Sequence, residues 1–269
     1  MTKFFGAAGR GLLPFFSAIV ETYRKGIAVW RRAPVLVAVA AIPEFAQHVV
    51  EIRLGMFASL DAAHALQNNP LRWDFGYAKI AGLVLALMLV SRYWGAGGSL
   101  RHTLRMPVVT LLRLLVGVSI LIGSSWLFSL NRAALPEYLD LAETVAGWFV
   151  QGGLFLWITA TLIEDRDTTL LDAFGKRFPS AVIILLLFLA AMLPALFVHR
   201  VDHRIVLCEP MAIQWAVMTF DALVVGAMGT LGGSALYVGF VSGLTWRGWR
   251  PLVADRRSRS GPVEARLPA

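Results

Sequence analysis

Three ionisable residues in one short segment of the chain could do chemistry within an otherwise apolar stretch. Glu44, His48 and Glu51 are spaced i, i+4, i+7, so in a helix they lie on one face. Carboxylates beside an imidazole can relay a proton, bind a metal ion or anchor a polar substrate. Two other interpretations stay open: a structural ion-pair cluster, or an apolar span that ends before these residues.

A charged group near the middle of a bilayer is costly and needs a partner. A helix that starts at Pro34 and rises about 1.5 Å per residue places Glu44 about 15 Å along its axis, close to mid-bilayer. Lys79 and Arg113 are basic residues inside other apolar stretches, and each is a candidate partner for Glu44. The predicted intramembrane polar cluster therefore contains Glu44, His48, Glu51, Lys79 and Arg113.

A second group of candidate ligands follows the fifth apolar stretch. His199 and His203 are one helical turn apart and can bind zinc or copper from one face. A metal site also needs a third ligand, so ordinary interfacial residues are the alternative interpretation, and no cofactor is expected. Glu143 and Asp221 lie near the outer ends of the fourth and sixth stretches, where we interpret them as acids that stabilise a helix N-terminus.

The elements that must carry these residues are membrane-spanning helices. Of the 269 residues, 57% are hydrophobic and 16% are charged, whereas a soluble domain has about 25% charged residues. Apolar stretches long enough to cross about 30 Å of hydrocarbon cover residues 34–50, 77–94, 107–130, 141–163 and 180–198, and a sixth ends near Trp246. The sequence predicts an all-α polytopic membrane protein with six transmembrane helices. The single cysteine, Cys208, excludes an internal disulfide framework.

The distribution of basic residues predicts the orientation. Segments 1–33, 92–105, 164–177 and 247–266 contain eighteen of the 25 lysines and arginines, and the loops on the opposite side contain five. This asymmetry predicts that both termini are cytoplasmic in a bacterial inner (plasma) membrane. The net charge of +8 then suits anionic lipids, and we do not expect nucleic acid as a partner.

Three Arg-x-Pro motifs divide the chain into stretches of similar length. Pro34, Pro107 and Pro179 each end a basic stretch and open an apolar one, and proline suits the first turn of a helix. We therefore predict one transmembrane domain of three helix pairs over residues 1–253, and a disordered basic tail over 254–269. The approximate repeats are 16–95, 97–163 and 165–246.

Each helix pair is expected to follow a cytoplasmic amphipathic helix that lies on the membrane. The strongest pattern spans residues 16–32, where apolar residues recur at helical spacing and charged residues occupy the remaining positions. The apolar face contains Phe16, Ile19, Val20, Tyr23, Ile27 and Trp30. The basic residues expected to contact lipid head groups are Arg24, Lys25, Arg31, Arg32, Arg105 and Arg177.

The last span is rich in glycine. Gly229 with Gly233, and Gly239 with Gly243, are pairs of small residues four apart that let helices approach closely. They predict packing within the bundle or between copies of the chain. A second copy or another membrane protein is therefore a candidate partner beside anionic lipid.

Two short stretches carry a resemblance to a known family. Residues 170–177 (LLDAFGKR) and 233–238 (GSALYV), together with the alternation of basic amphipathic helices and spans, resemble the membrane domain of glycerophosphodiester phosphodiesterases and the uncharacterised bacterial membrane proteins grouped with it. No motif of the catalytic barrel of those enzymes occurs. The resemblance implies a membrane module that stands alone and to which no catalytic residues are assigned.

The motifs of several enzyme classes do not occur in the sequence, among them the phosphate-binding loop, the Gly-x-Ser-x-Gly elbow and the His-Glu-x-x-His zinc helix. We therefore expect a non-enzymatic protein that binds anionic lipid in envelope or lipid homeostasis, or that serves as a membrane scaffold. The alternative is a transporter or channel for a small solute or ion, with the Glu44 face as its polar path. A membrane enzyme is a third class.

Overall fold

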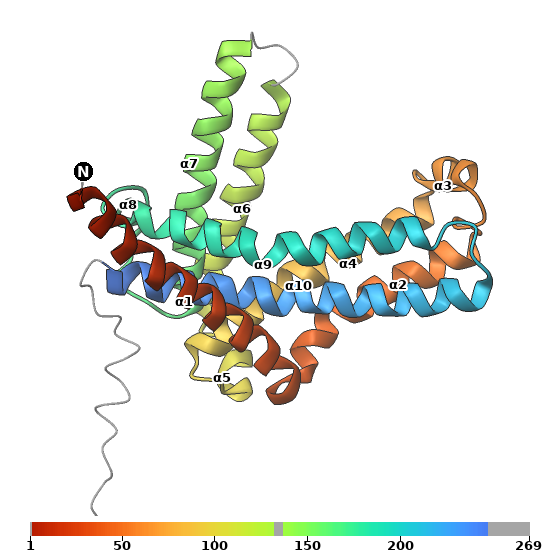
Figure 1. Ribbon diagram of the computed structural model, residues 1–269, viewed down its shortest axis with the longest axis horizontal. Coiled ribbons are helices and arrows are strands. Elements are labelled where there is room, and N and C mark those ends of the chain that lie inside the picture. The colour runs from red at the N-terminus through yellow and green to blue at the C-terminus, as the bar shows by residue number, and fades with distance from the viewer. Residues whose placement is uncertain (1, 132–136, 247–269) are drawn as a thin grey trace, which may run out of the picture. The chain divides into compact units, whose positions relative to one another are not determined.

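In a computed structural model the chain is helical, and the structure describes residues 2–131 and 137–246, with side chains over 14–127 and 143–243. The predicted tail, residues 254–269, lies outside this range. Within it the helices are α1 (Thr2–Arg32), α2 (Pro34–Arg53), α3 (Leu60–Leu66), α4 (Pro70–Gly95), α5 (Leu100–Leu104), α6 (Val108–Asn131), α7 (Glu137–Leu162), α8 (Leu170–Phe174), α9 (Phe178–Ile205) and α10 (Met211–Trp246) (Figure 1).

Six of these helices are long and apolar enough to cross a membrane, which confirms the six predicted spans. They cover Pro34–Arg53, Pro70–Gly95, Val108–Leu127, Glu143–Leu162, Phe178–Ile205 and Met211–Gly243. Several helices extend beyond the apolar stretch that predicted them. α4 begins at Pro70 because the Asn69 side chain accepts hydrogen bonds from the first backbone amides of the helix. α9 continues to Ile205, past the predicted end at Val198.

Each Arg-x-Pro motif lies at a helix start, as predicted. α2 begins at Pro34, α6 begins directly after Pro107, and Pro179 is the second residue of α9. Proline fits these positions because its φ is already helical and its missing N–H has no partner to lose in the first turn. The arrangement in three repeated pairs stays a prediction.

The chain divides into two compact units. The first contains Met1–Arg105 and Ile184–Val238, and the second contains Met106–Ile183 and Gly239–Ala269. In the first unit α2 packs against α4, and in the second α7 packs against both α6 and α8 (Figure 1). The division falls within α9 and α10, so each of these helices contributes to both units.

Glycines of α10 let this helix lie close to α2 and α4 in the first unit. A Cβ at Gly229 would lie 3.0 Å from the Cβ of Ala86 and 3.3 Å from the Cβ of Ala40. A Cβ at Gly233 would lie 2.7 Å from the carbonyl oxygen of Leu87. The pair Gly229 and Gly233 therefore serves packing within the bundle, one of the two roles that its spacing predicted.

α1 has three faces. Its residues Ala18, Thr22, Gly26 and Val29 are buried, and Gly26 lies against Leu231 of α10. The Oη of Tyr23 donates a hydrogen bond to the carbonyl oxygen of Ala190 in α9. The large apolar residues Phe16, Val20 and Ile27 stay exposed. The Nε1 of Trp30 donates a hydrogen bond to Oγ1 of Thr230 in α10. Two residues of the predicted apolar face, Tyr23 and Trp30, therefore contact the protein, and the rest of α1's exposed apolar surface comes from Phe16, Val20 and Ile27.

The other two predicted amphipathic helices are single turns. α5 and α8 contain five residues each. α8 begins with a capping box in which Thr169 and Asp172 hydrogen-bond each other's backbone amides. A hydrogen bond from Lys176 and the bonds with Thr169 lower the pKa of Asp172 to about 2. Helices therefore occur in both segments, and their position at the membrane surface stays a prediction.

Candidate functional site

A group of ionisable side chains lies inside the first unit, on α2, α4, α9 and α10. We call this group the polar centre. Four of its side chains are 0–1% exposed and four are 16–28% exposed, so half of the group is fully buried and half is partly accessible. The fully buried members are Glu44, His48, Glu51 and Asp221, and the partly exposed members are Arg72, Lys79, His199 and His203.

His48 is surrounded by carboxylates. Its Nδ1 lies 3.0 Å from Oε2 of Glu51, and its Nε2 lies 2.8 Å from Oδ2 of Asp221 and 3.1 Å from Oε1 of Glu44. The two glutamates reach the ring because they are four residues before and three residues after it on α2. Ionised carboxylates only accept hydrogen bonds, so this arrangement is satisfied when both ring nitrogens carry hydrogen.

α4 brings two basic side chains to the glutamates. The Nζ of Lys79 lies 2.8 Å from Oε1 of Glu44, which is the partner that the sequence suggested. The Nε of Arg72 lies 2.8 Å from Oε1 of Glu51. Sequence reasoning missed Arg72 because it precedes the apolar stretch that predicted this helix. Arg113, the fifth residue of the predicted cluster, lies on α6 in the second unit, where its side chain is exposed.

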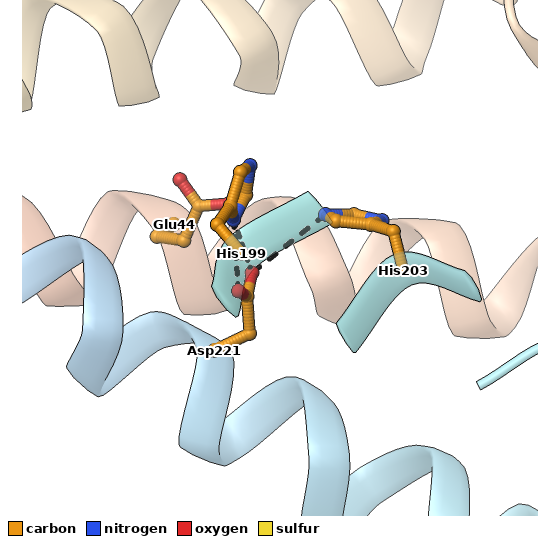
Figure 2. A group of neighbouring side chains, drawn as sticks. All are labelled: Glu44, His199, His203 and Asp221. Carbon is orange, nitrogen blue, oxygen red and sulfur yellow. Dashed lines mark hydrogen bonds and ion pairs between the residues drawn. The ribbon is translucent and has the colours of Figure 1, made fainter. Parts of the chain in front are cut away.

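Asp221 joins two histidines of α9 to the polar centre (Figure 2). The Nδ1 of His199 lies 2.8 Å from Oδ1 of Asp221, and the Nε2 of His203 lies 3.6 Å from Oδ2. The interpretation of Asp221 as an acid at a helix N-terminus is wrong, because α10 begins at Met211, well before it. One signal could have identified it: Asp221 is the only acidic or basic residue in α10.

Four of these residues form a set that could hold a metal ion. Glu44, His199, His203 and Asp221 each offer one ligand atom, and these atoms all lie within 4.8 Å of one another. Figure 2 shows the four side chains converging from three helices. The set combines two imidazole nitrogens with two carboxylate oxygens, which are ligands of zinc and neighbouring transition metals.

Apolar residues enclose the polar centre along the helix axes. On the side of the polar centre that faces the loops at residues 54–59 and 206–210, Phe57 and Val206 belong to a buried apolar cluster. On the other side Ala40 and Val225 are part of a second cluster, and each lies one helical turn from a carboxylate of the centre. The polar side chains therefore form a bounded site within the bundle.

The residues expected to contact lipid head groups do not share one environment. Arg24 is 73% exposed and paired with Glu21. The Nζ of Lys25 lies 4.1 Å from the ring centroid of Trp94, and burial lowers the pKa of this amine. Arg177, in the second unit, is 11% exposed, and its Nη1 lies 3.0 Å from Oδ2 of Asp165. The remaining three, Arg31, Arg32 and Arg105, are exposed.

Six helices of membrane-spanning length and a buried polar centre in the first unit are the architecture of a multi-pass membrane protein with an ionisable site inside its bundle. Comparisons with protein-family models, with curated proteins and with solved structures give no match. The resemblance to the membrane domain of glycerophosphodiester phosphodiesterases stays a prediction. The site is therefore interpreted from its own geometry and chemistry.

Proposed function

We propose that the protein is a carrier of a small cation in a bacterial inner membrane, with both termini in the cytoplasm and the polar centre as its binding site. The observation that carries this proposal is the ring of His48, which is fully buried and contacts carboxylates from α2 and α10. Ionisable groups inside membrane spans are costly to bury, and they characteristically mark ion or proton pathways.

The balance of charge around His48 favours a cation as the ligand. Among the described residues, the carboxylates of Glu44, Glu51 and Asp221 contact one lysine and one arginine, Lys79 and Arg72, and the other basic side chains that they contact are histidines. A proton on an imidazole or a bound metal ion offsets this excess of negative charge.

The apolar clusters on either side favour a carrier over an open channel. An open channel needs a continuous water-filled path, whereas Ala40 and Val225, one turn from the polar centre on its inner side, belong to a packed apolar cluster. The partial exposure of Lys79, His199 and His203 gives an ion access to the polar centre. We infer that transport requires a rearrangement that exposes the centre to the two sides in turn.

Flux in proteoliposomes tests this proposal. The full-length protein is reconstituted with a pH-sensitive or a Zn²⁺-sensitive dye trapped inside, and an ion gradient is imposed. Glu44→Gln and Asp221→Asn should each slow the flux by about tenfold or more, as expected when a binding group of a transport site is lost. Asp61→Asn changes an exposed acid of α3 and serves as the matched control.

Wild-type flux in both site variants, with helical content and melting behaviour that show them folded, contradicts transport through the polar centre. The same holds for a wild-type protein that gives no flux above empty vesicles with either dye. A flux that falls equally in Asp61→Asn shows a general loss of active protein and also contradicts the assignment.

A second candidate function, lipid binding in envelope homeostasis or as a membrane scaffold, is supported by the three faces of α1. Its exposed apolar residues Phe16, Val20 and Ile27 lie beside a face that carries Arg24, Arg31 and Arg32. Such a helix suits the interface of an anionic leaflet. As part of this proposal, α1 lies at the membrane surface and the spans form three repeated helix pairs.

Lipid selectivity in nanodiscs tests the second function. Spin-labelled phosphatidylglycerol should associate more strongly than phosphatidylcholine with the wild-type protein. The double variant Arg31→Gln, Arg32→Gln should lose part of this preference. Arg200→Gln, an exposed arginine near the opposite end of the spans, should keep it. An unchanged preference in the double variant argues against head-group contact by α1.

A further inference from the structure

We propose that the polar centre binds a divalent transition-metal ion such as Zn²⁺ through Glu44, His199, His203 and Asp221. This inference deepens the proposed function, on which it rests for its role in transport, by naming the class of ion. The binding step itself can be measured without transport.

The first support is the geometry of the four ligand atoms. They come from α2, α9 and α10 and lie within 4.8 Å of one another. In a tetrahedral zinc site with bonds of about 2.0–2.2 Å, neighbouring ligand atoms are about 3.5 Å apart. Small side-chain rotations therefore suffice to close the set around an ion. His199 and His203 are one turn apart on α9, so both rings reach the same point (Figure 2).

The second support is a buried oxygen of Glu44. Its Oε1 contacts Lys79 and His48, but its Oε2 is buried without a hydrogen-bond partner among the described residues. A buried carboxylate oxygen that lacks a donor is destabilising, and native proteins rarely retain one without a reason. Coordination to a metal ion supplies the missing interaction.

The third support is the set of residues that hold the ligands in place. Both ring nitrogens of His48 contact carboxylates, so His48 orients Glu44 and Asp221 and has no ring nitrogen left to coordinate the metal ion. Glu51, which fixes the other side of the His48 ring, is held in turn by Arg72 and Gln47. Hydrogen-bonded partners of this kind orient the ligands of metal sites.

The identity of the donors indicates the class of ion. Two nitrogens and two oxygens suit Zn²⁺ and its neighbours, whereas Mg²⁺ and Ca²⁺ prefer oxygen ligands alone. The free thiol of Cys208 is exposed and is not among the four grouped residues. We therefore expect a coordination sphere of nitrogen and oxygen only.

Titration of the purified protein with metal tests the inference. Tag-free full-length protein in detergent is stripped with a chelator and titrated with Zn²⁺ by calorimetry. Co²⁺ serves as an optical probe in a parallel titration. We expect one Zn²⁺ per chain and affinity for Mg²⁺ that is lower by about a hundredfold or more. His199→Asn and His203→Asn should each weaken Zn²⁺ binding by about tenfold or more. His64→Asn, an exposed histidine of α3, is the matched control and should bind as the wild type does.

Three results would overturn the metal site: no stoichiometric Zn²⁺ in the wild type, unchanged affinity in folded His199→Asn and His203→Asn, or a comparable loss in His64→Asn. Melting curves without metal show whether the variants are folded, and the Co²⁺ spectrum of the wild type tests the donor set even if they are not. A thiolate band in that spectrum overturns the assignment. Zn²⁺ binding without flux contradicts the carrier alone, and flux without Zn²⁺ binding contradicts the metal site alone.

Discussion

Replacing Asp221 with asparagine should weaken the first unit more than any substitution of an exposed acid. The carboxylate is fully buried and accepts hydrogen bonds from two rings, His48 and His199, each at 2.8 Å. Asparagine has nearly the same shape but keeps only one acceptor oxygen and turns an N–H₂ group toward the other ring. The variant therefore loses one charge-assisted hydrogen bond and a buried negative charge.

The size of the effect follows from these contacts. A hydrogen bond to a charged group contributes about 1.5–3 kcal/mol. The free energy of unfolding should fall by about that amount, because Glu44 and Glu51 continue to hold His48. For a protein of this size, about 1 kcal/mol corresponds to roughly 2–4 °C in Tm. We expect the Tm to fall by roughly 3–12 °C.

Thermal unfolding in detergent, followed by tryptophan fluorescence and circular dichroism, measures this change in metal-free protein. Asp61→Asn is the control, because its side chain is exposed on α3. A double-mutant cycle between Asp221→Asn and His199→Asn should give a coupling energy of about 1 kcal/mol or more, since the two residues share a hydrogen bond. A Tm of Asp221→Asn equal to that of Asp61→Asn, with no coupling to His199, would refute the described network.

Three further predictions concern other contacts of the first unit. Lys79→Met should lower the free energy of unfolding by about 1–3 kcal/mol, because Glu44 loses a basic partner. Adding Glu44→Gln should restore most of the lost stability, and unfolding curves of the single and double variants measure both effects. Gly82→Ala should destabilise the protein by about 1–3 kcal/mol, since its Cβ would lie 2.7 Å from the carbonyl oxygen of Val39. Gly123→Ala, with no atom within 4 Å of its Cβ, should not destabilise it. Burial lowers the pKa of Lys25 in the folded state, so as the pH rises the folded protein releases this proton before the unfolded protein does. The Tm of the wild type should therefore increase relative to that of Lys25→Met between neutral pH and about pH 10.5, the ordinary pKa of a lysine. A Tm difference that stays constant over this pH range would contradict the prediction.

The helices were predictable because their apolar stretches are long and their starts carry proline. Pro34, Pro107 and Pro179 lie within the first turn or directly before it, so the Arg-x-Pro motif located three helix starts. The ends were less predictable. α9 continues through His199 and His203 because backbone hydrogen bonding does not stop where hydropathy falls. The same applies to α10, which begins well before the uncharged stretch after Asp221.

The polar centre was predictable only in the part that lies on one helix. Helical spacing placed Glu44, His48 and Glu51 on the same face of α2, and the need for a counter-charge suggested Lys79. Asp221 lies far from them in the sequence and reaches His48 only through packing of α10 on α2, which glycines of α10 permit. Spacing along one helix carries no information about such contacts. A charge that stands alone in a long apolar helix remains a useful indicator of them.

X-ray absorption at the zinc K-edge tests the central claim most directly, because it reports the atoms around the ion in the wild-type protein. The four-residue set predicts a first shell of four nitrogen and oxygen atoms at about 2.0–2.2 Å, with the outer scattering of two imidazole rings. A first shell that contains sulfur would place the ion at Cys208. A shell of oxygens without imidazole, or an ion lost on washing, would contradict a zinc site in the polar centre.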